Sequence, residues 1–342
     1  MLTFLTPLYY LFSEGRRFLY QKGLLGKVRV PALVVSVGNI TTGGTGKTTV
    51  TQYLANYFYE KGKRVAVISH GVSGSRAGLI ISDGENILTD VKQAGDEAYL
   101  LARNLTSPEF GAAPGDGSPR RSSAGIPVLS GRRREIQARL ACEKFGAEVI
   151  ILDDAFHALR LHRDYDILVF NCLSRIGNGR LLPAGPLREP LVNIRRANII
   201  WLNQTDLVSA KEVDSFQQEI FRFNPTAAVV KSWYRYRRFC SLSGESIPLE
   251  GMTGKKVWLC AAIGEPQSFI KKMEKTGVLV VGVTLFADHH FYTEAELRKI
   301  NLETADFLVI TEKDSVRFPS VKLLKPVVYP EIELIVEDLN LC

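Results

Sequence analysis

A glycine-rich loop between an apolar run and a helical segment constrains this 342-residue chain more than any other feature. Residues 32–37 form the unbroken apolar run typical of a buried parallel strand, and residues 50–59 have helical character. Between them, residues 43–48 read Gly-Gly-Thr-Gly-Lys-Thr. This is the end of the phosphate-loop pattern G-x-x-x-x-G-K-[ST], with Thr41 where the first glycine would stand.

Such a loop has a direct chemical use. Glycines let backbone N–H groups turn inward around phosphate oxygens, and the start of the helix adds positive potential. Lys47 is expected to reach the β- and γ-phosphates, and the Thr48 hydroxyl is expected to ligate Mg²⁺. The alternative, a glycine-rich turn with an incidental lysine, is disfavoured by the strand-to-helix context. The nucleotide site is predicted to contain Gly43, Gly44, Thr45, Gly46, Lys47, Thr48 and Thr49.

Two carboxylates follow another apolar run. Asp153 and Asp154 come directly after residues 148–152, so they are expected at the end of a neighbouring strand. Mg²⁺ prefers oxygen ligands and takes only one or two from protein. One aspartate is expected to hold the ion through water and the other to orient it. A helix cap or turn is the alternative.

Further strands alternate with helical stretches, which predicts an α/β protein. The core expected around the phosphate loop is a mainly parallel sheet flanked by helices, the architecture of a P-loop NTPase. A helix over residues 209–226 is expected to leave this core, and the remainder is expected to form a smaller α/β unit. Its strands are predicted near residues 257–261, 278–284 and 307–310. The strands predicted for the core after the phosphate loop are residues 64–69, 148–152, 165–170 and 197–202.

This pattern predicts that the chain is divided into three parts. Residues 1–30 are predicted as an amphipathic helix, residues 31–210 as the nucleotide-binding domain and residues 211–342 as the smaller domain. Residues 106–125 are rich in Gly, Pro and Ser, which predicts a mobile surface loop.

The balance of charge favours acidic partners. The formal net charge is +7, and five scattered cysteines indicate reduced thiols in a cytosolic protein. Residues 231–239 interleave aromatics with cations, a composition that can bind nucleic acid, but a half-exposed strand explains it better. We predict no nucleic-acid partner because no nucleic-acid fold signature accompanies this segment.

The amino terminus combines apolar and basic residues. Apolar residues up to Phe12 are followed at once by Arg16 and Arg17, the reverse of the order in a secretory signal. Leu5, Leu8 and Phe12 fall at helical spacing. The pattern suits a helix lying in a bilayer interface, and equally a helix packed on the protein's own core.

Motifs spread over nearly the whole chain resemble those of the tetraacyldisaccharide 4'-kinases of lipid A biosynthesis. The most specific are the proline-rich stretch at residues 177–190 (GNGRLLPAGPLREP) and Thr311-Glu312-Lys313-Asp314. The others are Val37-Gly38-Asn39-Ile40-Thr41 before the phosphate loop, Gly95-Asp96-Glu97, Leu161-His162-Arg163-Asp164, Ala262-Ile263-Gly264-x-Pro266 and Asp288-His289-His290.

The resemblance implies a Mg²⁺-dependent kinase that transfers the γ-phosphate of ATP to the 4'-hydroxyl of a tetraacyldisaccharide 1-phosphate. It implies Asp96 as general base, assisted by His289, with His290 less certain. It also favours the interfacial reading of the amino terminus, with the protein bound peripherally to an anionic membrane surface at the cytoplasmic face of the bacterial inner membrane. The smaller domain is then expected to close over the active site.

The chain also departs from the family pattern. Where the family has Ser-Arg-Gly-Tyr-Gly, residues 69–73 read Ser-His-Gly-Val-Ser, so an arginine and a tyrosine are missing; Arg76 is one candidate substitute. After Asp154 the chain reads Ala155-Phe156-His157 where the family has Gly-Phe-Gln. Two alternatives therefore stay open, a family member with reduced activity and a membrane-associated nucleotide switch or positioning ATPase.

Overall fold

The computed structural model describes residues 6–70, 78–106 and 125–337. The loop expected over residues 106–125 therefore lies, apart from its two ends, outside the described residues, as does Arg76.

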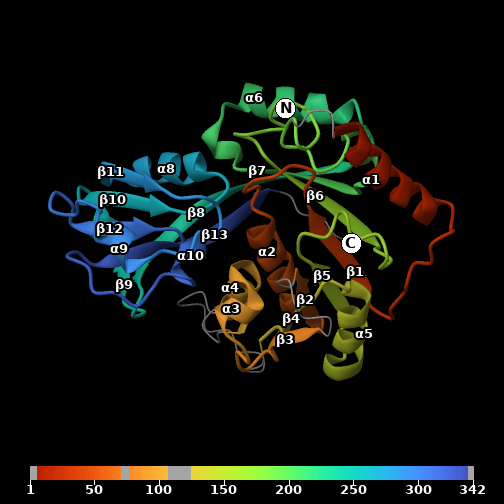
Figure 1. Ribbon diagram of the computed structural model, residues 1–342, viewed down its shortest axis with the longest axis horizontal. Coiled ribbons are helices and arrows are strands. Elements are labelled where there is room, and N and C mark those ends of the chain that lie inside the picture. Colours follow the sequence, from red (N-terminus) through yellow and green to blue (C-terminus); the bar gives the residue numbers. More distant parts are fainter. Residues whose placement is uncertain (1–5, 71–77, 107–124, 338–342) are drawn as a thin grey trace.

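One large sheet runs through the described chain (Figure 1). Its strand order is β11-β10-β12-β13-β8-β7-β6-β1-β5-β2-β4-β3, with β9 paired to β8. The strands are β1 (Leu33–Gly38), β2 (Val65–Ser69), β3 (Leu79–Ser82), β4 (Val128–Ser130), β5 (Val149–Leu152), β6 (Tyr165–Asn171), β7 (Ile199–Asn203), β8 (Ala228–Ser241), β9 (Ser246–Pro248), β10 (Lys256–Ala261), β11 (Leu279–Leu285), β12 (Phe307–Ile310) and β13 (Val327–Glu337).

The strand before the phosphate loop lies in the middle of the parallel part of this sheet. β1 is parallel to β5 on one side and to β6 on the other, and its last five residues are buried. Burial on both faces explains why the run is apolar without alternation. The predicted strands and the mainly parallel α/β sheet are confirmed. β3, β4, β9 and β13 were not predicted, and β3 pairs with β4 in antiparallel orientation.

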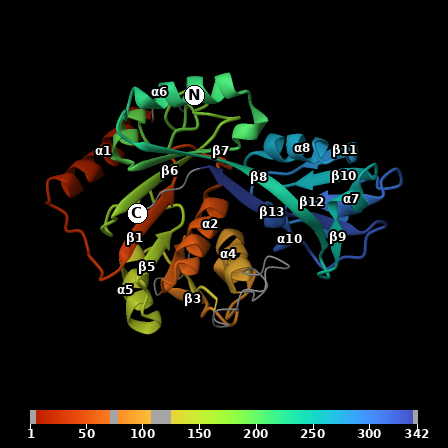
Figure 2. The ribbon, with the colours of Figure 1, turned by 180° about the vertical axis from the view of Figure 1, so that it is seen from behind.

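Helices cover both faces of the sheet (Figure 2). Buried residues of α2 and α4 pack with Val35 and Val67, whereas those of α5 pack with Val34 and Ile68, which point to the opposite face. The helices are α1 (Thr6–Gln21), α2 (Lys47–Glu60), α3 (Val91–Ala94), α4 (Asp96–Thr106), α5 (Arg134–Phe145), α6 (Ala210–Phe221), α7 (Leu249–Met252), α8 (Pro266–Glu274), α9 (Glu294–Leu297) and α10 (Glu312–Ser315).

The helix expected to leave the core instead packs on the sheet. Ser209 caps α6 with a reciprocal capping box to Glu212, and Phe216 of this helix is fully buried against Phe170 of β6. The ring centroids of Phe216 and Phe170 are 5.7 Å apart.

Two long antiparallel strands join the two halves of the sheet. β8 is parallel to β7 on one side and antiparallel to β13 on the other, so the sheet continues into β12, β10 and β11. The basic segment at residues 231–239 lies in β8, and the guanidinium groups of Arg235 and Arg238 pair with Glu333 and Glu331. The half-exposed strand predicted as the alternative is confirmed. The domain division near residue 210 stays a prediction.

The amino-terminal helix carries exposed apolar side chains. Phe18 is 52% exposed and Leu24, just beyond the helix, is 70% exposed. The helix is held to the body of the protein by a hydrogen bond from Asn193 Nδ2 to Glu14 Oε1 (2.9 Å). Among the described residues, none of the helices is both long and apolar enough to cross a bilayer.

Candidate functional site

Asparagine side chains from strand ends hold the phosphate loop in place. Asn203, at the end of β7, donates to the Thr45 carbonyl oxygen (3.0 Å), and Asn39 Nδ2 donates to Thr45 Oγ1 (3.2 Å). Asn171, at the end of β6, donates to the Gly44 carbonyl oxygen (3.4 Å). Asn203 was not among the predicted site residues, yet it supports the loop.

Glycine is required at the start of α2. Gly46 caps this helix with φ of 90°, in the left-handed region that favours glycine. A Cβ atom there would lie 2.0 Å from Tyr234 Oη and 2.2 Å from Asn203 Nδ2. The glycine therefore meets two needs, an unusual backbone conformation and close packing against β7 and β8.

The carboxy-terminal half of the sheet contacts the phosphate loop directly. A Cβ on Gly264, just after β10, would lie 3.0 Å from Gly43 Cα and 3.0 Å from Asp288 Oδ2. The motif Ala262-Ile263-Gly264 thus forms one wall of the site, because only a glycine allows this approach.

A cluster of opposite charges surrounds Asp154. Lys47 Nζ lies 3.8 Å from Asp154 Oδ1, and Arg188 Nη1 donates to Asp154 Oδ2 (3.0 Å). Burial raises the pKa of Asp154, but Lys47 and Arg188 outweigh it and lower the pKa to about 2. Asp154 stays ionised and lines the cavity, and its backbone φ is 45°.

Asp153 has a different environment. Its carboxylate is buried and accepts hydrogen bonds from Thr51 Oγ1 (3.0 Å) and Ser69 Oγ (3.2 Å). Burial, with the negative charges of Glu97 and Asp154, raises its pKa to about 6. The two aspartates predicted as metal ligands are therefore not equivalent.

The donor set fits Mg²⁺ better at Asp154 than at Asp153. Thr48 and Asp154 line the cavity, whereas Asp153 is buried and does not reach it. In the described part of the chain, no cluster of three His, Cys, Asp or Glu side chains could hold a metal. Mg²⁺ tolerates this, since it keeps waters and takes phosphate oxygens as ligands.

Asp96 and His289, remote in sequence, are brought together. Asp96 begins α4, and His289 follows β11 with a positive φ of 63°. His289 Nδ1 lies 2.9 Å from Asp96 Oδ2 and 3.1 Å from Oδ1. The hydrogen bond to Asp96 raises the pKa of His289.

A second histidine of the same motif points elsewhere. His290 Nε2 lies 3.0 Å from Glu296 Oε2, and its ring stacks on Phe286 with centroids 4.8 Å apart. Of the two candidates, His289 is therefore the histidine that contacts Asp96.

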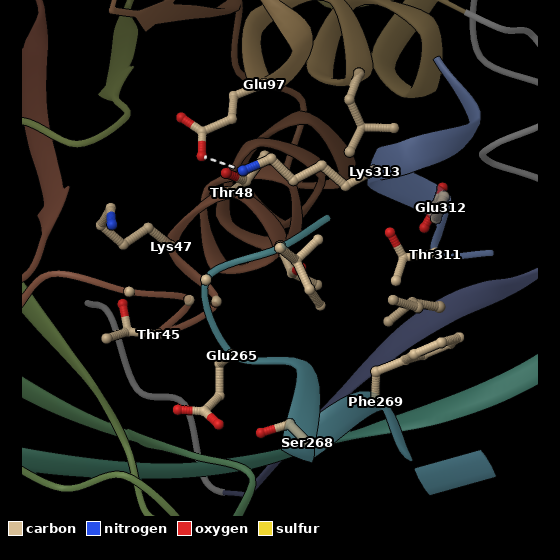
Figure 3. Close-up of a pocket in the computed structure, with 18 of the residues that line it drawn as sticks. Thr45, Lys47, Thr48, Glu97, Glu265, Ser268, Phe269, Thr311, Glu312 and Lys313 are labelled. Carbon is tan, nitrogen blue, oxygen red and sulfur yellow. Dashed lines mark hydrogen bonds and ion pairs between the residues drawn. The ribbon is translucent and has the colours of Figure 1, made fainter. Parts of the chain in front are cut away.

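The Thr-Glu-Lys-Asp motif caps α10 and faces the phosphate loop. Lys313 Nζ donates to Glu97 Oε1 (3.0 Å), above Thr48 in Figure 3, and lies 3.9 Å from Asp288 Oδ1. Burial lowers the pKa of Lys313, but Glu97, Asp96 and Asp288 together raise it.

One cavity of about 460 Å³ joins these groups. It extends from the phosphate loop to Asp96 and His289, with Tyr234 and Phe269 on an apolar wall. A donor nucleotide and an acceptor hydroxyl could meet in such a space.

The proline-rich stretch at residues 177–190 packs against the phosphate loop. The Thr42 N–H donates to the Pro186 carbonyl (2.7 Å), and the Arg188 N–H donates to the Ile40 carbonyl (2.7 Å). This pairing brings the Arg188 side chain to Asp154.

The departures from the family pattern lie beside the same cluster. His70 lines the cavity, and burial followed by the charge of Arg134 lowers its pKa. Desolvation, with the charges of Arg134 and Arg188, lowers the pKa of His157 to about 4. Arg188 and Lys47 supply cations here without the missing arginine.

Sequence reasoning missed one residue that touches the predicted base. Arg317, after α10, donates from Nη1 to Asp96 Oδ2. The only local signal was an arginine three residues after the Thr-Glu-Lys-Asp motif, which does not identify a partner 221 residues away.

Comparisons with known proteins agree along nearly the whole chain. A family model described as Tetraacyldisaccharide-1-P 4'-kinase matches residues 1–110 and 120–340. A tetraacyldisaccharide 4'-kinase from Halothermothrix orenii is 37% identical over 335 residues, covering 93% of this chain and 82% of that protein. One from Anaeromyxobacter sp. (strain K) is 36% identical over 311 residues, covering 88% and 76%. A crystal structure of LpxK from Aquifex aeolicus in complex with ATP aligns with a TM-score of 0.74 at 30% identity, covering 98% of this chain and 94% of that one.

Proposed function

This chain belongs to the tetraacyldisaccharide-1-phosphate 4'-kinase family, and from that premise we propose that it phosphorylates the 4'-hydroxyl of a tetraacylated glucosamine disaccharide 1-phosphate with ATP. The observation that carries the proposal is the pairing of Asp96 with His289 in the cavity that the phosphate loop also lines. A nucleotide switch needs no such pair facing its γ-phosphate.

The phosphate end of the reaction uses the loop and its cations. Backbone N–H groups of residues 43–49 cradle the phosphates, and Lys47 neutralises charge that develops on the transferring group. Arg188 and Asp154 fix the position of the Lys47 ammonium, since Asp154 contacts both cations. Phosphoryl transfer depends on such positioning more than on a strong base.

The acceptor end uses Asp96. A carboxylate whose pKa is lowered to about 2 removes the hydroxyl proton only as the new bond to phosphorus forms. His289 orients this carboxylate through Nδ1 and shares the proton. Residues 211–342 supply His289 and the Gly264 wall, so this part closes the site against water.

Mg²⁺ would be held by the Thr48 hydroxyl and Asp154. Asp153 would not contact the ion; it accepts a hydrogen bond from Thr51, which lies one turn after Thr48 in α2. When bound, the ion neutralises charge on the β- and γ-phosphates.

The membrane surface is the proposed location. Phe18, Leu19 and Leu24 are exposed beside Arg16 and Lys22 at the amino terminus, a combination that suits a helix in the interface of an anionic bilayer. A lipid acceptor whose acyl chains stay in the bilayer would then meet the site without leaving the membrane. We place the enzyme peripherally at the cytoplasmic face of the inner membrane.

Purified protein incubated with γ-labelled ATP, Mg²⁺ and a tetraacylated glucosamine disaccharide 1-phosphate in detergent tests this proposal. Label is expected on the lipid, with a large loss for Lys47→Ala and for Asp96→Ala. ATP hydrolysis without labelled lipid would overturn the proposal and favour a nucleotide switch.

A further inference from the structure

A buried arginine connects the predicted base to the carboxy-terminal half of the sheet. The Arg317 side chain is fully buried and does not line the cavity, whereas Asp96 and His289 do. Arg317 therefore reaches neither nucleotide nor acceptor, and any effect on the reaction must pass through a neighbour.

The arginine makes a forked contact with three groups. Nη1 donates to Asp96 Oδ2, and Nη2 donates both to Asp314 Oδ1 and to the Ala262 carbonyl. The planar guanidinium suits this arrangement because its donors lie in fixed directions. Asp314 is itself held, since it accepts from Thr311 Oγ1 (2.6 Å) and from the Ala262 N–H (3.2 Å).

The Asp96 carboxylate is thus hydrogen-bonded by side chains from two different segments. His289 approaches from the loop after β11, and Arg317 approaches from the segment after α10. Without Arg317 the carboxylate would keep the imidazole and the N–H of Glu97 as hydrogen-bond partners.

The remaining charges around Asp96 come from three elements. Glu97 lies on its own helix, Asp288 lies beside His289, and Lys313 lies on α10. Burial raises the pKa of Asp96, and His289, Lys313 and Arg317 together lower it to about 2.

We propose that Arg317 is a positioning residue that fixes the Asp96 carboxylate for proton removal from the acceptor hydroxyl. The inference rests on the proposed function, because it assigns the base role to Asp96. It adds a residue from the carboxy-terminal half of the sheet, whose fully buried guanidinium pairs with a base that lines the cavity.

A double-mutant cycle with Asp96→Asn tests this. Arg317→Met is expected to lower kcat about 10- to 100-fold, as expected for the loss of a hydrogen bond to a charged group, with KM for ATP and lipid unchanged. In the Asp96→Asn background, the same change is expected to have no further effect on the residual rate, because its only route to the reaction is gone. A structural role would lower the rate in both backgrounds.

Arg103→Met is the matched control. Arg103 also joins α4 to α10, with Nη1 2.8 Å from Ser315 Oγ and Nη2 3.7 Å from Glu312 Oε1, but it does not touch Asp96. Its kcat is expected to equal that of the wild type. If Arg103→Met loses as much kcat as Arg317→Met, or if the Arg317→Met loss persists in the Asp96→Asn background, the positioning role is wrong.

Failure of the base assignment can be distinguished from failure of the positioning role. If Asp96→Asn is fully active, the proposed base itself fails, whatever Arg317 does. If Arg317→Met does not fold, the cycle is run with Arg317→Lys, which keeps a cation beside Asp314 but cannot form the fork. Arg317→Lys is expected to lower kcat less than Arg317→Met does, and to have no effect in the Asp96→Asn background. If Arg317→Lys keeps the wild-type kcat while Asp96→Asn is impaired, the forked contact is not needed.

Discussion

Replacing Gly46 with alanine tests whether the shape of the phosphate loop is set by packing against β7 and β8. An alanine must adopt a φ of 90°, and its Cβ would overlap Tyr234 Oη and Asn203 Nδ2. The backbone conformation costs about 1 to 2 kcal/mol for a non-glycine residue.

The overlap adds to this strain. Asn203 Nδ2 cannot stay where it donates to the Thr45 carbonyl (3.0 Å) and to Tyr234 Oη (2.7 Å). Each lost hydrogen bond is worth about 1 kcal/mol, so the total is about 3 to 4 kcal/mol. If the loop shifts to relieve this cost, ATP affinity is expected to fall roughly 150- to 700-fold, since every 1.4 kcal/mol is a factor of ten.

Gly244→Ala is the matched control. Gly244 lies in the turn between β8 and β9 with φ of 92°, and a Cβ there would meet no atom within 4 Å. It carries the backbone strain without the overlap, so its ATP affinity is expected to be unchanged. ATP titration calorimetry and thermal unfolding of both variants measure the two effects. Wild-type ATP affinity in folded Gly46→Ala would refute the reasoning.

Three further outcomes are expected. The pKa of Asp153 in the folded protein, about 6, lies above the ordinary aspartate value of 3.8, so the contribution of Asp153 to stability is present below about pH 4 and is lost as the pH rises through 6. Asp153→Asn removes this loss and should gain about 3 kcal/mol over wild type near pH 8 but not near pH 4, measured by urea unfolding of metal-free protein; an equal difference at both pH values would contradict the assignment. Deleting residues 1–22 should weaken binding to anionic vesicles in a sedimentation assay, and unchanged binding would refute the interfacial helix. Phe216→Ala should lower the free energy of unfolding by about 3 to 5 kcal/mol, because its ring is fully buried against Phe170; a cost below about 1 kcal/mol in chemical denaturation would contradict this packing.

Local pattern was enough to predict the phosphate loop and its setting. A buried parallel strand must be apolar throughout, and a loop that cradles phosphate needs glycine. Both requirements can therefore be recognised in a stretch of about 15 residues. The same holds for Asp153 and Asp154, which directly follow a buried strand. The family resemblance added Asp96 and His289 from short motifs.

Only the tertiary structure decided how these pieces act together. Asp96 and His289 are 193 residues apart, and Arg317 is 221 residues from Asp96, so no local spacing relates them. Their contact depends on β8 and β13, whose antiparallel pairing carries the sheet from the phosphate loop to β10 and β12. Likewise, the different environments of Asp153 and Asp154 arise from what packs on each: Thr51 and Ser69 on one, Lys47 and Arg188 on the other. Burial and charges from distant parts of the chain set the pKa of a carboxylate, and neither can be inferred from the residues next to it in the sequence.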